Sequence, residues 1–459
     1  MRHMKPKKKG SFFTLAVLVV LAFCLMVAEL HAMPPVARTV LKNHLVLLHS
    51  EDPSLPFVTL QLLIDAGSAK DPDGKEGLAY LTARGLMLGT AQRSQTDINE
   101  KLDFLGASLA SSIGRDYAVL SLRVLKKDLD EGLALLLEVL TQPAFQEKEL
   151  MHERKKTLAL IQSEEDQPEV VAEKSFMKAL FASGPYRHPS SGTEESLPRL
   201  TKEDVLNFYR TYYHTNNCIL AVAGDIGPEE IKKKLVSMFE NQSEGAPQDI
   251  PVRNVFSDLS KGPVTVMIDR QISQANIVIG SRGISRGNPD FYALSVMNYI
   301  LGSGGFASRL LEEIRNKRGL AYSVESFFDP GRYEGSFQIV LQTKNTSASE
   351  AISLAVGQIK LIQEGLVSEK ELEGAKRYLI GSFPLRVDTQ AKLAGFMLQE
   401  EYYGLGQDYP EKYPDLIRAV TKEDVLRVAR SYLHPDKYVL VIVGNLKETS
   451  LEQDKLKQK

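Results

Sequence analysis

Cysteine is scarce in this sequence, and the two cysteines lie far apart. Cys24 falls in an apolar segment near the start of the chain, whereas Cys218 lies in its middle. The bulky Phe23 directly before Cys24 argues against a lipid-modified cysteine. If the apolar segment is removed on export, Cys218 alone remains and no disulfide can form within the chain. Hydrophobic cores must therefore stabilise the fold.

The chain also lacks a charge excess and any low-complexity tract. It has 56 basic and 58 acidic residues, a net charge of −2, 43% hydrophobic residues and 25% charged residues. This composition excludes a disordered or fibrous protein and gives no electrostatic case for a nucleic-acid partner. A length of 459 residues predicts two to four domains.

A long apolar run occurs once, near the N-terminus. A basic stretch precedes the apolar residues Phe12 to Ala28, and Ala32 offers a small residue for cleavage. We predict that residues 1–32 are a signal peptide or an uncleaved membrane anchor, with the rest extracytoplasmic or periplasmic. Loss of these residues removes five basic and one acidic residue and shifts the net charge to −6.

An internal repeat sets the expected architecture. The segment Thr201-Lys202-Glu203-Asp204-Val205-Leu206 recurs 220 residues later as Thr421-Lys422-Glu423-Asp424-Val425-Leu426. Each copy begins with a capping box and predicts a short amphipathic helix. Each helix is followed by a turn and a buried strand, Ile219–Ala223 in the first copy and Tyr438–Val443 in the second.

The rest of the chain fits two homologous α+β halves, residues 33–240 and 263–459, with a linker at 241–262. We expect each half to be a β-sheet with helices packed mainly on one face. The predicted strands are Phe57–Ala66, Ala118–Val124, Ala275–Gly280 and Gly335–Leu341, and the predicted helices are Gly77–Leu88, Asp128–Thr141, Tyr292–Leu301 and Ala348–Glu364.

Two motifs in the second half carry a family resemblance. The sequence Leu301-Gly302-Ser303-Gly304-Gly305-Phe306-Ala307-Ser308-Arg309-Leu310 is followed by Arg315-Asn316-Lys317-Arg318-Gly319-Leu320-Ala321-Tyr322. Together they resemble the signature of pitrilysin/insulinase-type (inverzincin) metallopeptidases, in the branch of the mitochondrial processing peptidase. The resemblance covers nearly the whole mature chain. It implies a clamshell-like chamber formed with a partner subunit.

The zinc motif of that family is degenerate here. The family uses an H-x-x-E-H helix and a distant Glu, which supply two histidine ligands, a general base and a third ligand. The resemblance places Tyr80 and Arg84 at the histidine positions, Ala83 at the base and Leu160 at the third ligand. These side chains are poor zinc ligands or have no lone pair, and the eight histidines do not cluster elsewhere. We expect this chain to bind no metal, and zinc to be held by the partner.

The resemblance implies a second catalytic contribution, from Arg315 and Tyr322. In the family, an Arg and a Tyr seven residues apart contact the substrate backbone and stabilise the developing oxyanion. The alternative is that Arg315 is a surface charge and Tyr322 an ordinary aromatic at a strand start. For the loop of Gly302, Ser303, Gly304 and Gly305, the resemblance implies a mobile element at substrate entry, and the alternative is a simple strand-to-helix turn.

These features predict a zinc-less subunit of a heterodimeric peptidase. A homologous partner with H-x-x-E-H would supply zinc and base, and peptides would be the substrates. The alternative is an inactive scaffold or peptide-binding module of an envelope complex. Turnover is expected only with the catalytic partner.

Overall fold

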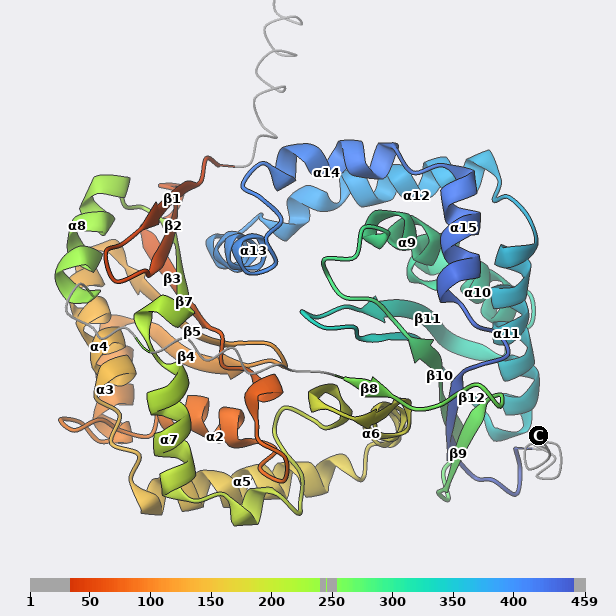
Figure 1. The fold of residues 1–459 in the computed structure, drawn as a ribbon, viewed down its shortest axis with the longest axis horizontal. Coiled ribbons are helices and arrows are strands. Elements are labelled where there is room, and N and C mark those ends of the chain that lie inside the picture. Colours follow the sequence, from red (N-terminus) through yellow and green to blue (C-terminus); the bar gives the residue numbers. More distant parts are fainter. Residues whose placement is uncertain (1–33, 240–244, 246–253, 450–459) are drawn as a thin grey trace, which may run out of the picture. The chain divides into compact units, whose positions relative to one another are not determined.

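Two mixed β-sheets form the framework of the protein (Figure 1). This computed structural model describes residues 34–239, 245 and 254–449. The predicted export segment and most of the predicted linker lie outside these ranges. In the described part of the chain, no helix has the length and apolar character needed to cross a bilayer.

The first sheet has six strands in the order β1-β2-β7-β3-β5-β4, and all neighbours are antiparallel except β2 and β7. Its strands are β1 Ala37–Val40, β2 Val46–Glu51, β3 Phe57–Ile64, β4 Ser108–Ile113, β5 Ala118–Leu125 and β7 Cys218–Gly224. Helices of the same half share one hydrophobic core with it, namely α2 Leu78–Gly85, α3 Gln95–Leu105, α4 Leu129–Thr141, α5 Glu147–Glu164, α7 Lys202–Tyr212 and α8 Pro228–Phe239.

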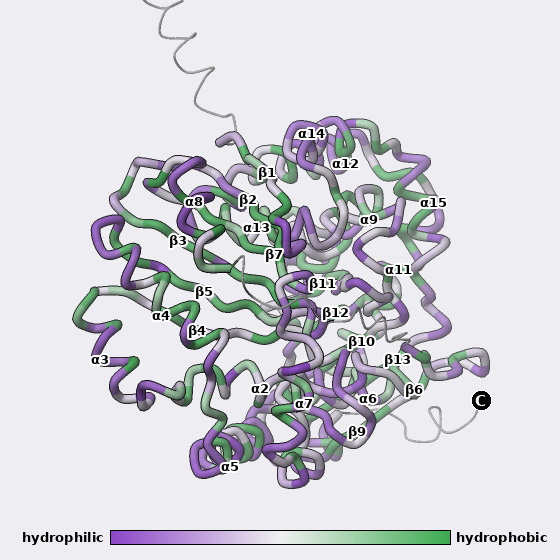
Figure 2. The backbone as a smooth tube through the Cα atoms, turned by 60° about the vertical axis from the view of Figure 1, so that its left-hand side comes forward, coloured by the Kyte–Doolittle hydropathy of each residue, from purple (hydrophilic) through white to green (hydrophobic). Residues whose placement is uncertain are grey.

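The second sheet repeats this plan with five strands, in the order β11-β12-β10-β13-β9. Its strands are β9 Val264–Asp269, β10 Gln274–Arg282, β11 Ala321–Asp329, β12 Ser336–Lys344 and β13 Val439–Gly444, and the single parallel pair is β13 with β9. A second core joins it to α9 Phe291–Asn298, α10 Arg309–Leu311, α11 Ala348–Glu364, α12 Glu369–Gly381, α14 Tyr409–Arg418 and α15 Lys422–Tyr432. In Figure 2 the strands of both sheets are largely hydrophobic.

The predicted duplication and the α+β fold class are confirmed. Helices α7 and α15 both begin with the predicted capping box. The Thr201 hydroxyl accepts a hydrogen bond from the Asp204 N–H at 3.1 Å, and the same bond between Thr421 and Asp424 measures 3.0 Å. Such a cap contributes about 1 kcal/mol. The strand that follows each helix, β7 or β13, lies inside its sheet because it is hydrophobic throughout.

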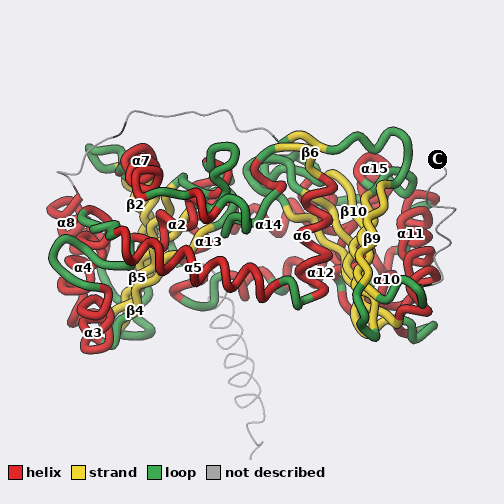
Figure 3. Tube along the Cα trace, turned by 90° about the horizontal axis from the view of Figure 1, so that it is seen from below, coloured by secondary structure: helices red, strands yellow, loops and turns green. Residues whose placement is uncertain are grey.

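Each half also contributes one helix to the sheet of the other half. Helix α6 (Pro168–Leu180) packs on the second sheet through Phe176 and Val171, and α13 (Gln390–Tyr402) lies against β7 and β3 of the first. Ala221 and Ala223 of β7 are excluded from the first core, and their small side chains leave room for α13. Helix α5, about 27 Å long from its 18 residues, leads the chain toward α6 (Figure 3). In each half the helices of that half therefore lie mainly on one face of the sheet, as expected, and one helix from the other half lies on the opposite face.

A partly buried polar network joins the 330–335 loop to the first half. The Asp116 carboxylate accepts hydrogen bonds from the Tyr186 hydroxyl and from the backbone N–H of Arg332, the latter at 2.7 Å. The Arg332 guanidinium pairs with Asp65 at 2.9 Å. Tyr402 of α13 donates to the same Asp65 carboxylate at 3.1 Å. These contacts fix the β11–β12 hairpin, which carries Tyr322, relative to the first sheet.

Residues 254–262, the end of the predicted linker that the structure describes, contain a short strand. Strand β8 (Val255–Phe256) pairs with β6 (Phe181–Ser183), the strand that directly follows α6. The chain thus passes beside the exchanged helix before it enters the second sheet.

Candidate functional site

Helix α2 carries three of the four degenerate zinc positions. Gly77 precedes it with φ of 91°, and a Cβ at this position would lie 2.7 Å from the carbonyl oxygen of Ser191. The helix start is held by Asp71, whose two carboxylate oxygens accept the backbone N–H groups of Gly77 and Ala79 at 2.8 and 2.7 Å. A side chain six residues before Gly77 thus caps the helix, in keeping with the positive N-terminal end of the helix dipole.

A salt bridge now occupies one of the ligand positions. The Arg84 Nε lies 2.9 Å from Glu153 Oε1, and the Glu153 side chain is only 7% exposed. Glu153 belongs to α5, which packs against α2. Because a guanidinium bears a fixed positive charge and no lone pair, Arg84 balances a buried carboxylate in place of binding a metal.

The remaining zinc positions do not supply ligands either. Ala83 is buried in the first core, Tyr80 is half-buried, and Leu160 of α5 is 50% exposed. Across the described residues, no group of three or more His, Cys, Asp or Glu side chains could hold a metal ion. The donor set at the family's zinc position therefore does not fit zinc.

Arg315 and Tyr322, predicted as a pair, are brought together. Arg315 lies on a π-helical turn, Glu312–Asn316, and Tyr322 lies at a register shift near the start of β11. The Arg315 guanidinium carbon is 4.7 Å from the centre of the Tyr322 ring and 5.0 Å from that of Phe306. π-turns and bulges re-aim side chains and are frequent at functional sites.

The polar ends of this pair are not used inside the protein. Tyr322 is 81% exposed, and in the described residues no hydrogen bond or ion pair engages its hydroxyl or the Arg315 guanidinium. The neighbouring Arg309, in contrast, is bound by both its Nε and Nη2 to Glu371 at 2.6 and 3.1 Å. The pair is thus a set of available donors held in place by aromatic contacts.

The predicted glycine loop is a second irregular helix turn. Residues Tyr299–Ser303 form a π-helical turn, and Gly305–Ala307 a short 3-10 turn. A Cβ on Gly302 would lie 2.3 Å from Ser326 Oγ, so this glycine permits close packing onto β11. Gly305 has φ of 54°, and Ser303 is exposed. The loop therefore joins β11 and the Arg315 turn, and the predicted contact of Gly302, Ser303, Gly304 and Gly305 with substrate stays a prediction.

An acidic groove beside the exchanged helix α6 is missing from the sequence interpretation. It has a volume of about 500 Å³ and lies where α6 leaves the β11–β12 face of the second sheet uncovered. Glu169 and Glu173 of α6 and Glu325 of β11 line it, without any lysine or arginine. The buried Gln338 also lines the groove, and its Oε1 accepts no hydrogen bond from the described residues.

Glu153, Phe306 and this groove are the functional candidates that sequence reasoning missed. Glu153 lies seven residues, two helical turns, before Leu160, so helix periodicity alone places it on the same face of α5. The groove has no sequence signal, since it depends on α6 crossing to the second sheet.

Comparisons with known proteins identify the family. The profile "Insulinase (Peptidase family M16)" matches residues 46–194, and "Peptidase M16 inactive domain" matches residues 199–379. An uncharacterised zinc protease of Streptomyces coelicolor is 26% identical over 91% of each chain. The "non-peptidase homolog YmxG" of Helicobacter pylori is 25% identical over 87% of this chain and 92% of its own.

Solved structures give the same result. The crystal structure of a peptidase M16 inactive domain from Pseudomonas fluorescens has a TM-score of 0.81 and 28% identity, over 89% of this chain and 98% of that chain. The crystal structure of a protease from Helicobacter pylori has a TM-score of 0.82 at 19% identity, over 90% and 100% of the two chains, and supports the fold alone. This chain belongs to the insulinase family, peptidase family M16, as an inactive-type homologue that lacks the H-x-x-E-H zinc motif.

Proposed function

We propose that this chain is the zinc-free subunit of a heterodimeric extracytoplasmic peptidase. A homologous partner with H-x-x-E-H supplies the zinc and the general base, and this chain supplies Arg315 and Tyr322. The observation that carries the proposal is the state of this pair: both polar groups are available, and Tyr322 is 81% exposed. A residue retained for packing alone would be expected to bury its ring.

The chemistry follows from the two side chains. A guanidinium and a phenol donate directed hydrogen bonds, and donors aimed at a developing oxyanion stabilise the transition state more than the substrate. Since the Arg315 guanidinium lies over the rings of Phe306 and Tyr322, these two contacts hold it before substrate arrives. Such preorganisation lowers the entropic cost of reaching the partner's site.

The acidic groove indicates the substrate class. Glu169 and Glu173 are one helical turn apart on α6, and Glu325 faces the same groove from β11, an edge strand. Edge strands bind extended peptides through the backbone, while flanking pockets select side chains. A groove with three carboxylates and no basic residue favours a lysine or arginine side chain, so we propose peptides with basic residues as substrates.

The test is the turnover of the reconstituted pair on a basic peptide. Replacing Tyr322→Phe removes one donor and should lower kcat about 10²-fold. Tyr378→Phe is the matched control, because Tyr378 is also exposed (55%) and its ring also packs against another side chain, the ring of Tyr299. Equal turnover in the Tyr322→Phe and wild-type pairs would refute the catalytic assignment.

The second candidate is a peptide-binding or scaffold subunit without a catalytic role. The complete loss of zinc ligands favours it, and the Helicobacter pylori relative is itself named a non-peptidase homolog. In that case the acidic groove would still bind a basic peptide, and Glu173→Gln would weaken binding while Tyr322→Phe left the complex unchanged.

A further inference from the structure

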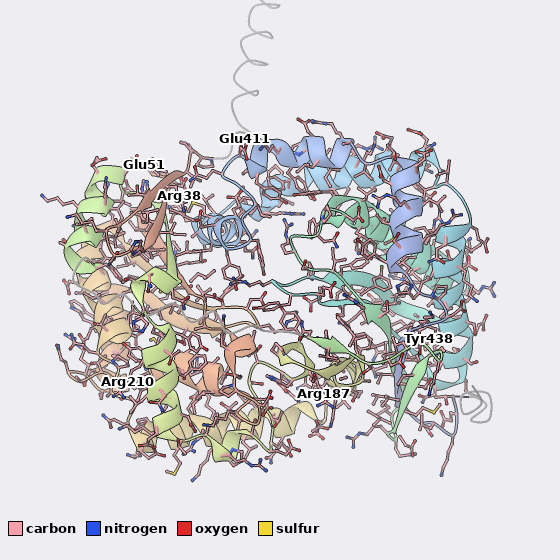
Figure 4. The ribbon with its side chains drawn as sticks, viewed as in Figure 1. Arg38, Glu51, Arg187, Arg210, Glu411 and Tyr438 are labelled. Carbon is pink, nitrogen blue, oxygen red and sulfur yellow. The ribbon has the colours of Figure 1, made fainter. Side chains whose placement is uncertain are left out.

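A large cavity of the first half lies outside the candidate site. Its volume is about 1140 Å³, and it is bounded by the 69–78 segment before α2, the 182–189 segment after α6, and the 204–212 part of α7. Arg187, labelled in Figure 4, lies on the second of these segments. None of Tyr80, Ala83 or Arg84 lines it, so its occupant need not contact the degenerate zinc position.

Most carboxylates of this lining are already committed to local partners. Asp71 holds the start of α2 with both oxygens, at 2.8 and 2.7 Å. The Asp204 carboxylate accepts the backbone N–H of Thr201 in the capping box of α7 and pairs with Lys75 of the same lining at 2.5 Å. Glu76 accepts a backbone N–H at 3.1 Å, and Glu195 accepts hydrogen bonds within its own turn. Among the described residues, Asp73 is the lining carboxylate without such a bond.

Three cations of the lining, in contrast, have either one long ion pair or none. The Lys70 side chain is 8% exposed, and its ammonium is 3.8 Å from Asp65, beyond hydrogen-bond distance. That carboxylate is already paired with Arg332 at 2.9 Å. In the part of the chain that the structure describes, Lys178 and Arg187 have no ion pair within 4.0 Å.

A buried ammonium without a hydrogen-bond partner is unfavourable, and a bound oxyanion would compensate it. We propose that this cavity binds an oxyanion through Lys70, Lys178 and Arg187, and that its source is the terminal carboxylate of a peptide. The size supports this source, because about 1140 Å³ exceeds what a single inorganic ion needs and suits several residues around the carboxylate. The proposal concerns the isolated chain and does not depend on a catalytic partner.

The test is the affinity of the isolated chain for one peptide made in two forms, a free C-terminal acid and an amide, measured by titration calorimetry at low salt. We expect the acid to bind about tenfold more tightly, and the double variant Lys178→Gln/Arg187→Gln to abolish the difference. Lys174→Gln is the matched control, since Lys174 lines the same cavity but is paired with Glu164 at 2.8 Å. Thermal unfolding verifies that all variants fold.

Inorganic phosphate, titrated in parallel, separates the two sources. Phosphate binding that is lost in the double variant, with acid and amide peptides equal, would support the anion site but identify a free ion as its occupant. Equal affinity of the two peptides together with no phosphate binding would overturn the proposal. So would an acid preference that survives the double variant. Neither result depends on the turnover of the paired enzyme, so the two proposals fail separately.

Discussion

Arg84 and Glu153 allow a quantitative test of how the vacated zinc position is stabilised. Replacing Arg84→Met leaves the Glu153 carboxylate, 7% exposed, without its 2.9 Å partner. Lys156 is the other cation near Glu153, but it is 3.9 Å away and 57% exposed. Breaking a fully buried pair costs roughly 3–5 kcal/mol. Since the Arg84 side chain is 33% exposed, we expect a loss of about 2 kcal/mol.

Replacing Glu153 in place of Arg84 should lower the free energy of unfolding by less. Glu153→Gln leaves Arg84 uncompensated, but its guanidinium reaches solvent, so we expect about 1 kcal/mol. The double variant Arg84→Met/Glu153→Met removes both charges and replaces them with apolar side chains of similar length. It should therefore be more stable than Arg84→Met alone, because no buried charge remains.

Urea unfolding followed by circular dichroism measures these differences. Arg418→Met is the control, because Arg418 forms a pair of 2.6 Å with Asp415 in which both side chains are largely exposed, and the expected change is below about 0.5 kcal/mol. The reasoning is refuted if Glu153→Gln destabilises more than Arg84→Met, or if the double variant is no more stable than Arg84→Met alone.

Two further predictions concern the stability of the second half. Gly302→Ala should destabilise the protein by about 1–3 kcal/mol, because the added Cβ would lie 2.3 Å from the Ser326 hydroxyl oxygen. Gly357→Ala, in the middle of α11 where nothing lies within 4 Å of an added Cβ, should stabilise it by roughly 0.5–1 kcal/mol. Thermal unfolding of both variants checks the sign of each change. Burial, together with repulsion from Glu411 (labelled in Figure 4), raises the pKa of Glu400 from its usual 4.5 to about 8. The native state thus favours protonated Glu400, so the wild type loses stability as the pH rises from 4.5 through 8. The Glu400→Gln variant should be more stable than the wild type at pH 9 by on the order of 2 kcal/mol, and equally stable at pH 4. A pH-independent difference in unfolding midpoint would contradict this.

Local sequence patterns predicted much of the fold. The helix Ala348–Glu364 has the predicted bounds, and β3, β5 and β12 lie within two or three residues of theirs. These elements have strong periodicity and clear end signals, so local chemistry determines them. The predicted helix Tyr292–Leu301 differs, because it changes to a π-helical turn at Tyr299, where Gly302 packs closely against Ser326 of β11.

The exchanged helices could not be predicted in this way. The amphipathic pattern of α6 would be the same on either sheet, so the pattern does not tell which sheet this helix covers. Helix α6 reaches the second sheet because of the length of α5 and the contacts of the folded chain. The acidic groove depends on this crossing. Likewise, the motif spacing identified Arg315 and Tyr322, but their contact with Phe306 arises from two irregular turns that periodicity does not reveal.

The central claim is that this chain completes the active site of a homologous zinc-bearing subunit. Affinity purification of the chain from its own envelope extract, with mass spectrometry of the co-purifying proteins, tests it most directly. The account predicts a stoichiometric M16 homologue that carries H-x-x-E-H. Recovery of the chain alone, or only with unrelated proteins, would contradict it.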